Sequence, residues 1–289
     1  AAGARVVLGA DLGFAEQLAA GNSAAAVVVD ANGTEWVVRV PIAGSGRRLS
    51  LRSEAVIGEA LASLGHPVTR WTVVVVDGVE CSVGRRLPGQ PVSYGAEWSS
   101  GLVRSLAGAF DDLHRLPAEG FGPLINRDDA LVGMSSSPAE AIQLRWFHAR
   151  IWPFDNPSLA GPPVHAPLPG AVAGLAALTP RVLDAGFGPA GVVHSDVHRE
   201  HVLVDGDRNL AGLLDFGDAF IGAVAWDVAL VRWYYGDDVA SALIVRLGGG
   251  ERLIADGAAL SLAGGLYKLA KQPGDAAVLH RLERCIHAT

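Results

Sequence analysis

The chain has few of the features that mark several common protein classes. Its 289 residues include two cysteines, Cys81 and Cys285, too few for the disulfide framework of a small secreted protein. No apolar run approaches the roughly 18 residues of a membrane-spanning helix. The first residues lack a basic segment followed by a long apolar core, so we expect a cytoplasmic protein without a secretory signal.

Basic residues are in the minority. The chain carries 23 Lys and Arg against 30 Asp and Glu, for a formal charge of −7. This balance argues against a nucleic-acid partner, whose phosphates attract basic patches. We expect a monomer that acts on a small molecule and has no membrane partner. An acidic surface suits a cationic small molecule. Apolar residues make up 50% of the chain, which indicates a well-cored globular protein.

The most informative stretch covers residues 192–227. Short apolar strands at residues 190–193, 202–204 and 210–214 enclose polar loops, and together they predict a hairpin that brings Asp196, His201 and Asp215 close together. Phosphoryl transfer needs a carboxylate that orients or deprotonates the attacking hydroxyl, and hard ligands for a divalent metal. Asp196 is the candidate catalytic base, and His201 and Asp215 are the candidate metal ligands.

The spacing of these residues resembles a family motif. The pattern His194-x-Asp196-x-His198-x-x-His201, followed by Leu-Leu-Asp215-Phe, is similar to the Brenner-type motif of the aminoglycoside phosphotransferase family, antibiotic kinases related to protein kinases. His201, where most members have Asn, resembles the macrolide phosphotransferase branch. The resemblance implies Mg²⁺ as cofactor and ATP or GTP as phosphoryl donor, with the choice of purine left open.

The resemblance also implies a bilobal, protein-kinase-like α+β fold. We expect a small N-terminal antiparallel β lobe with one helix, which binds nucleotide (residues 1–88). A larger, mainly helical lobe carries the catalytic loop and acceptor site (residues 89–289), and Pro88-Gly89 marks the boundary. Strands are predicted at residues 6–8, 27–29, 35–40, 71–76 and 80–84, and helices at residues 53–64 with Ser53 as N-cap, 98–116, 138–152, 171–185 and in much of 238–287.

Several residues of the first lobe match nucleotide-binding positions of the family. Arg39 stands where kinase-like enzymes carry a strand lysine, and Glu54 or Glu59 could pair with it, with Glu54 the better match. The first turn has no Gly-x-Gly-x-x-Gly pattern, so backbone amides and the Ser23 hydroxyl would serve the phosphates. The purine edge would meet the backbone of Gly84, Arg85 and Arg86.

Further residues of the second lobe are candidates for loop support or for the acceptor site. Asp227 matches a family aspartate whose implied role is to accept backbone amides of the catalytic loop. His194, His198 and Asp218 lie in or beside that loop. We interpret His114 as a packed histidine at a helix end. Clustered acids could attract a cationic drug: Glu200, Asp218, Asp237 and Asp238.

The best-supported hypothesis is a small-molecule kinase that phosphorylates a hydroxyl of an aminoglycoside, macrolide or cationic peptide antibiotic and gives resistance. The alternatives are a kinase of a metabolic alcohol such as an amino alcohol or sugar, a zinc hydrolase using the four side chains His194, Asp196, His198 and His201, and a kinase-like protein that binds ligand without turnover. The sequence does not name the acceptor.

Overall fold

A computed structural model describes the backbone of residues 7–9, 12–18, 23–42, 51–93, 95–127, 129–145, 180–182, 184–271 and 274–287. Most of the helix predicted at residues 171–185 lies outside these ranges. Residues 21 and 22 of the first turn also lie outside them.

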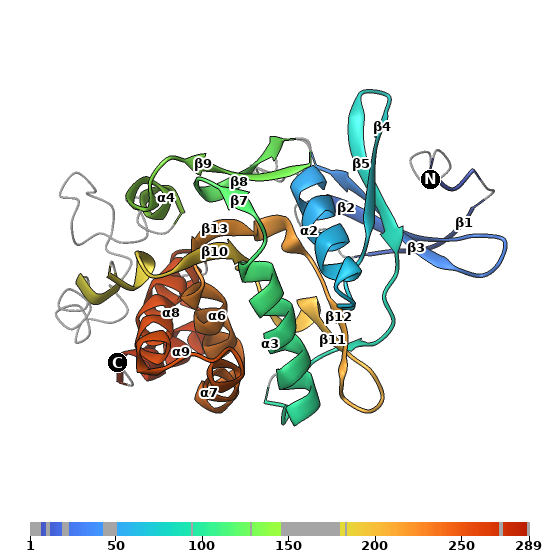
Figure 1. The fold of residues 1–289 in the computed structure, drawn as a ribbon. Helices are drawn as coiled ribbons and strands as arrows, with labels where there is room; N and C mark the ends of the chain where they lie inside the picture. The colour runs from blue at the N-terminus through green and yellow to red at the C-terminus, as the bar shows by residue number, and fades with distance from the viewer. Residues whose placement is uncertain are drawn as a thin grey trace.

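The N-terminal part of the chain forms a five-stranded antiparallel sheet with the strand order β1-β2-β3-β5-β4 (Figure 1). The tight turns within it contain Gly33 and Gly78, which take positive φ angles of 78° and 77°. Val28, Val38 and Val83 form a small core on one face. The strands are β1 (Gly13–Gln17), β2 (Ser23–Val29), β3 (Glu35–Pro41), β4 (Trp71–Val76) and β5 (Val79–Arg85).

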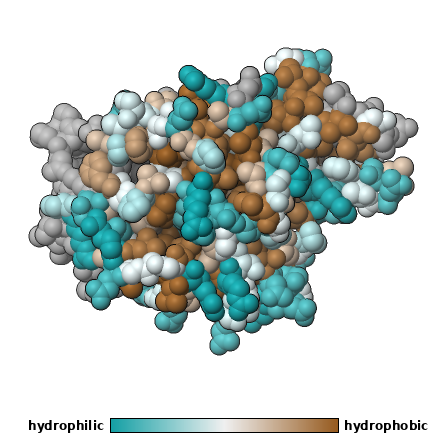
Figure 2. Space-filling model, in the orientation of Figure 1, coloured by the Kyte–Doolittle hydropathy of each residue, from teal (hydrophilic) through white to brown (hydrophobic). Residues whose placement is uncertain are grey.

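Four of the five predicted strands are confirmed, and the first is wrong. Val7 and Leu8 are helical, and the edge strand is β1 instead. All five residues of β1 are exposed, so this strand has no alternation of apolar and polar residues that would reveal it in the sequence. At the other edge apolar side chains remain at the surface over β4 and β5, where Val75 and Val79 are 55% and 45% exposed (Figure 2).

One helix, α2 (Leu51–Ser63), packs beside this sheet. It buries Ile57 and Leu61, whereas Leu64 is 59% exposed. The N-cap prediction is wrong, because Ser53 lies inside the first turn and its hydroxyl donates to the carbonyl of Ile125 at 3.2 Å. The helix therefore begins two residues earlier and is tied to a distant strand.

Two further sheets follow. One has the order β10-β13-β8-β9-β7 and the other the order β12-β11-β6. The hairpin of β8 and β9, which contacts α2, was not predicted. Their strands are β6 (Gln90–Pro91), β7 (Ala118–Glu119), β8 (Phe121–Arg127), β9 (Ala130–Ser135), β10 (Ala190–Val193), β11 (Val202–Val204), β12 (Leu210–Leu213) and β13 (Phe220–Ala223).

Helices dominate the second part of the chain (Figure 1). The helix predicted at residues 98–116 is confirmed as α3 (Ser100–His114), in which Leu102, Leu106, Phe110 and Leu113 are buried and Ser99 caps the N-terminus. No helix among the described residues is long and apolar enough to cross a membrane. The other helices are α4 (Pro138–Arg145), α6 (Ala225–Tyr235), α7 (Asp237–Arg246), α8 (Glu251–Lys271) and α9 (Ala276–His287).

Candidate active site

The backbone of the loop after β10 is held by a buried carboxylate. Asp227, at the start of α6, is fully buried and accepts the backbone N–H groups of His194 at 3.0 Å and Ser195 at 2.9 Å. Nε2 of His114, the last residue of α3, donates to the same carboxylate at 2.9 Å. Ser195 takes a positive φ of 61° and donates its hydroxyl to the carbonyl of Asp218 at 2.6 Å. One carboxylate thus orders the start of the loop and joins it to two helices.

His194 links the loop to the segment after β12. It is fully buried, and its Nε2 donates to the carbonyl of Leu214 at 2.8 Å while its Nδ1 accepts the N–H of Asp196 at 3.3 Å. Burial holds the pKa of His194 below its usual value, although Asp227 acts in the opposite direction. Both ring nitrogens are occupied, so His194 is not part of the four-ligand zinc cluster considered from the sequence.

Asp196, His201 and Asp215 lie side by side. The Asp196 carbonyl accepts from Nδ1 of His201 at 2.7 Å, and the Asp196 carboxylate lies 3.7 Å from the same nitrogen. Nδ1 is therefore a donor, and Nε2 of His201 faces a carboxylate oxygen of Asp215 at 3.6 Å. In the neutral imidazole this Nε2 carries a lone pair. His201 belongs to a short 3₁₀ turn, η2 (Arg199–His201), that leads into β11.

This arrangement fits a divalent cation. Two acceptor atoms that face each other, as His201 and Asp215 do, are stabilised by a positive charge between them. Their 3.6 Å separation is longer than the about 3.0 Å between adjacent ligands of an octahedron with bonds near 2.1 Å, so the two groups would move closer together to hold Mg²⁺ in that geometry. Asp215 is held in place by its left-handed backbone (φ 58°) and by the N–H of Gly217, at the start of η3 (Phe216–Asp218).

Arg39 approaches the same place from β3. Its Nη2 donates to Glu54 of α2 at 2.7 Å, and its Nη1 lies 3.9 Å from Asp215. The Glu54 side chain is fully buried and that of Arg39 is 11% exposed. Burial alone would lower the pKa of Arg39, but the Glu54 and Asp215 carboxylates together outweigh it and the pKa is raised. Glu59, the other partner considered for Arg39, pairs instead with Arg70.

His198 lies beside both Asp196 and His201. Its Nε2 is 3.7 Å from the Asp196 carboxylate, and its ring centroid is 3.7 Å from that of His201, with the two rings tilted by 37°. Burial and the neighbouring His201 lower the pKa of His198. Beyond it stands the ring of Tyr234, with centroids 6.1 Å apart, under Lys268. No sequence pattern pointed to Tyr234 or Lys268, which lie far from the motif.

The predicted nucleotide-binding residues lie on the first sheet. Ser23 is the first residue of β2, opposite Pro41. Gly84 and Arg85 end β5 between β3 and β4, and Arg86 leaves the sheet with its backbone N–H donated to the carbonyl of Glu35 at 3.0 Å. The Arg86 side chain forms ion pairs with Glu16 and Glu35 on the sheet edge.

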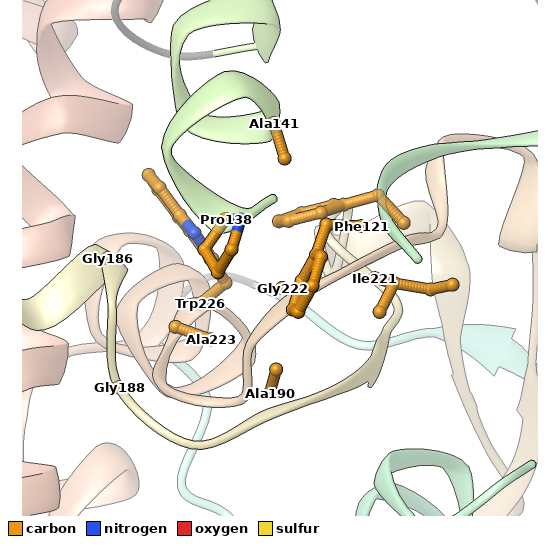
Figure 3. Close-up of a pocket in the computed structure, with 11 residues that line it drawn as sticks. Phe121, Pro138, Ala141, Gly186, Gly188, Ala190, Ile221, Gly222, Ala223 and Trp226 are labelled. Atoms are coloured by element: carbon orange, nitrogen blue, oxygen red, sulfur yellow. The ribbon is translucent and has the colours of Figure 1, made fainter. Parts of the chain in front are cut away.

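A small apolar cavity of about 70 Å³ lies elsewhere, among β10, β13, α4 and α6 (Figure 3). Ala190 and Ala223, which pair with each other at the ends of β10 and β13 remote from the catalytic loop, contribute to its lining. None of the predicted site residues is among the described residues around this cavity. It is distinct from the cluster at Asp196.

The sheet with one helix, followed by a mainly helical part that carries the loop after β10, defines a bilobal protein-kinase-like fold. The chain belongs to the phosphotransferase enzyme family, whose sequence model matches residues 15–261, most of the chain. It is therefore classed as a phosphotransferase with an alcohol group as acceptor. A search among curated protein sequences found no significant match.

Solved structures show the same fold. Aminoglycoside phosphotransferase APH(4)-Ia is 17% identical, with a TM-score of 0.64, 96% of this chain and 93% of that chain covered. Macrolide 2′-phosphotransferase MphH from Brachybacterium faecium is 21% identical, with a TM-score of 0.59 and coverages of 99% and 97%. The GDP and kanamycin complex of APH(2″)-IIia is 15% identical, with a TM-score of 0.58 and coverages of 94% and 91%.

Proposed function

We propose that this protein transfers the γ-phosphoryl group of a nucleoside triphosphate to a hydroxyl of a small molecule. The observation behind the proposal is that the side chains of Asp196, His201 and Asp215 lie close together. Arg39 faces the Asp215 carboxylate. In the reaction, the acceptor oxygen forms a bond to the γ-phosphorus, the bond from that phosphorus to the bridging oxygen breaks, and the nucleoside diphosphate leaves.

Asp196 acts as the catalytic base. Its carboxylate is 24% exposed, so it can reach an acceptor hydroxyl, and it orients that hydroxyl and takes its proton as the new bond forms. The carboxylate is placed by the loop backbone, since the Asp196 N–H and carbonyl are bound by His194 and His201. Asp227 supports the first two residues of the same loop, and the Asp218 carbonyl holds Ser195.

His201 and Asp215 would hold Mg²⁺, which neutralises charge on the β- and γ-phosphates when bound. Arg39, fixed by Glu54, contributes a second positive charge to the triphosphate. Residues 1–88 form the nucleotide-binding lobe in this proposal, and residues 89–289 carry the remaining site. Ser23 would meet the phosphates, and the backbone of Gly84, Arg85 and Arg86 the purine.

The proposal includes ATP or GTP as donor. Support comes from structural neighbours, which include a ternary complex of APH(4)-Ia with ADP and hygromycin B and the complex of APH(2″)-IIia with GDP and kanamycin. By the same reasoning the proposed acceptor is an antibiotic of the aminoglycoside, macrolide or cationic peptide type, with resistance as the outcome, and His198 shapes the acceptor pocket.

One observation favours a metabolic alcohol as the alternative acceptor. The ring of Tyr234, beside His198, is faced by two cations, Lys268 at 5.4 Å and Arg281 at 5.9 Å. Among the acids expected to attract a cationic drug, Asp237 is paired with Arg232. A cationic wall near Asp196 suits a neutral or anionic hydroxyl compound better than a polycation.

The test is a transfer assay over both acceptor classes. Purified protein is incubated with Mg²⁺ and either ATP or GTP, and with aminoglycosides, macrolides, peptide antibiotics, amino alcohols or sugars. Mass spectrometry then measures the acceptor. We expect one class to gain a phosphoryl group in equal amount to the nucleoside diphosphate released. Nucleotide binding without transfer to any acceptor would refute catalysis and favour a kinase-like binding protein.

A further inference from the structure

Arg39 makes more contacts than an ion pair with Glu54 requires. Its Nε donates to the hydroxyl of Ser82 at 3.2 Å, and its guanidinium carbon lies 3.9 Å from the centre of the Trp71 ring. With Nη2 bound to Glu54, two of the three nitrogens are engaged and one face of the plane is covered. The third nitrogen, Nη1, points to Asp215 at 3.9 Å, too far for a hydrogen bond.

The first sheet has space for the Trp71 ring beside Gly84. Trp71 on β4 pairs with Gly84 on β5, and Gly84 pairs in turn with Val37 on β3, next but one to Arg39. A Cβ atom on Gly84 would lie 2.8 Å from the Trp71 ring and 2.3 Å from the Thr69 side chain, closer than real Cβ contacts come. Gly84 therefore leaves the space in which the indole crosses the middle strand toward Arg39.

Ser82 completes the arrangement. It pairs with Arg39 across the strands and is fully buried, so its hydroxyl has a fixed position at the Nε edge of the guanidinium. A planar guanidinium can use Ser82, Glu54 and the indole face together, whereas a lysine ammonium offers one nitrogen and no plane. The surroundings of position 39 thus match arginine specifically.

We propose that Trp71, together with Ser82, is a positioning residue that directs Nη1 of Arg39 at an oxygen of the triphosphate tail beside Asp215. The inference rests on the proposed function, since it needs a nucleoside triphosphate at this site. In this arrangement Arg39 binds the triphosphate in place of the strand lysine of kinase-like enzymes. Trp71 acts only through Arg39 and touches neither phosphate nor acceptor.

The experiment is a double-mutant cycle on nucleotide affinity, with Trp71→Leu and Arg39→Lys singly and combined. Calorimetry with Mg²⁺ measures the Kd of a non-hydrolysable triphosphate analogue and, separately, of the bare nucleoside. Trp71→Phe keeps an aromatic face. Trp36→Leu is the matched control, because it removes the same side chain from the same sheet, where the indole of Trp36 contacts Asp30 instead of Arg39.

We expect Trp71→Leu to weaken the triphosphate analogue about fivefold, the size of a partly buried cation–π contact, and to leave the nucleoside within about twofold. Trp71→Phe and Trp36→Leu should stay within about twofold for both ligands. In the Arg39→Lys background, Trp71→Leu should change triphosphate affinity by less than about twofold, because the plane that it covers is gone.

Equal losses from Trp71→Leu in both backgrounds, or equal losses of nucleoside and triphosphate, would overturn the inference and leave a purely structural tryptophan. If the wild-type protein still transfers phosphate, these results would leave the proposed function unchanged. A wild-type protein that binds no triphosphate would overturn the proposed function itself, and the positioning role with it.

Discussion

Removal of the Glu54 carboxylate should destabilise the fold strongly, because it leaves a charge without its partner. The Glu54 side chain is fully buried, 2.7 Å from Arg39, which is itself only 11% exposed. Taking one partner from a buried ion pair costs roughly 3–5 kcal/mol. Arg39 retains Ser82 and a distant Asp215, so we expect Glu54→Ala to lower the free energy of unfolding by about 3 kcal/mol.

Glu59→Ala is a close control on the same helix. Glu59 also pairs with an arginine, Arg70, but both side chains are more than half exposed, at 59% and 54%. Solvent screens such a pair, so its loss should cost less than about 1 kcal/mol. Urea denaturation at neutral pH measures both variants, and Arg39→Met combined with Glu54→Ala should lose less than the sum of the single changes. Equal costs for Glu54→Ala and Glu59→Ala would refute the reasoning.

Three further predictions concern the core around the site. Asp227→Asn removes the charge that binds two loop amides and should lower the free energy of urea unfolding by about 2 kcal/mol, with reduced phosphoryl transfer. Gly191→Ala would place a Cβ atom 2.3 Å from the backbone oxygen of His114, and should lower the midpoint of urea unfolding through a loss of about 2 kcal/mol, whereas an unchanged midpoint would contradict this packing. Burial raises the pKa of the Cys285 thiol from 9.0 to about 11, so the thiol should react with a thiol reagent at pH 8 only after unfolding. The free energy of unfolding should fall as the pH rises from 9.0 to about 11, because the thiol ionises more readily in the unfolded chain.

The catalytic hairpin was predictable because its information is local. The apolar strands β11 and β12, the turn between them and the polar residues beside them follow one another within a few dozen residues. The helix predicted at residues 98–116 was likewise observed, as α3 (Ser100–His114). In both cases the sequence pattern and the final packing agree, so short-range rules were sufficient.

The features of the structure that the sequence did not predict depend on long-range contacts. His114 meets Asp227 across 113 residues of sequence, so the chain around His114 shows only a helix end. Trp71 and Gly84 look like ordinary members of a hairpin until β3 packs beside them. Strand β1 is exposed on both faces, and its pairing with β2 comes from backbone hydrogen bonds, which leave no trace in side-chain pattern.

The most direct test of the account is the turnover of Asp196→Asn with nucleotide binding measured on the same sample. The amide keeps the size of the carboxylate but cannot take the acceptor proton. We predict that kcat falls about a thousandfold. The Kd of the triphosphate should remain within about twofold, since Arg39, His201 and Asp215 are untouched. A variant that keeps most of its activity would contradict the assignment of Asp196 as the catalytic base.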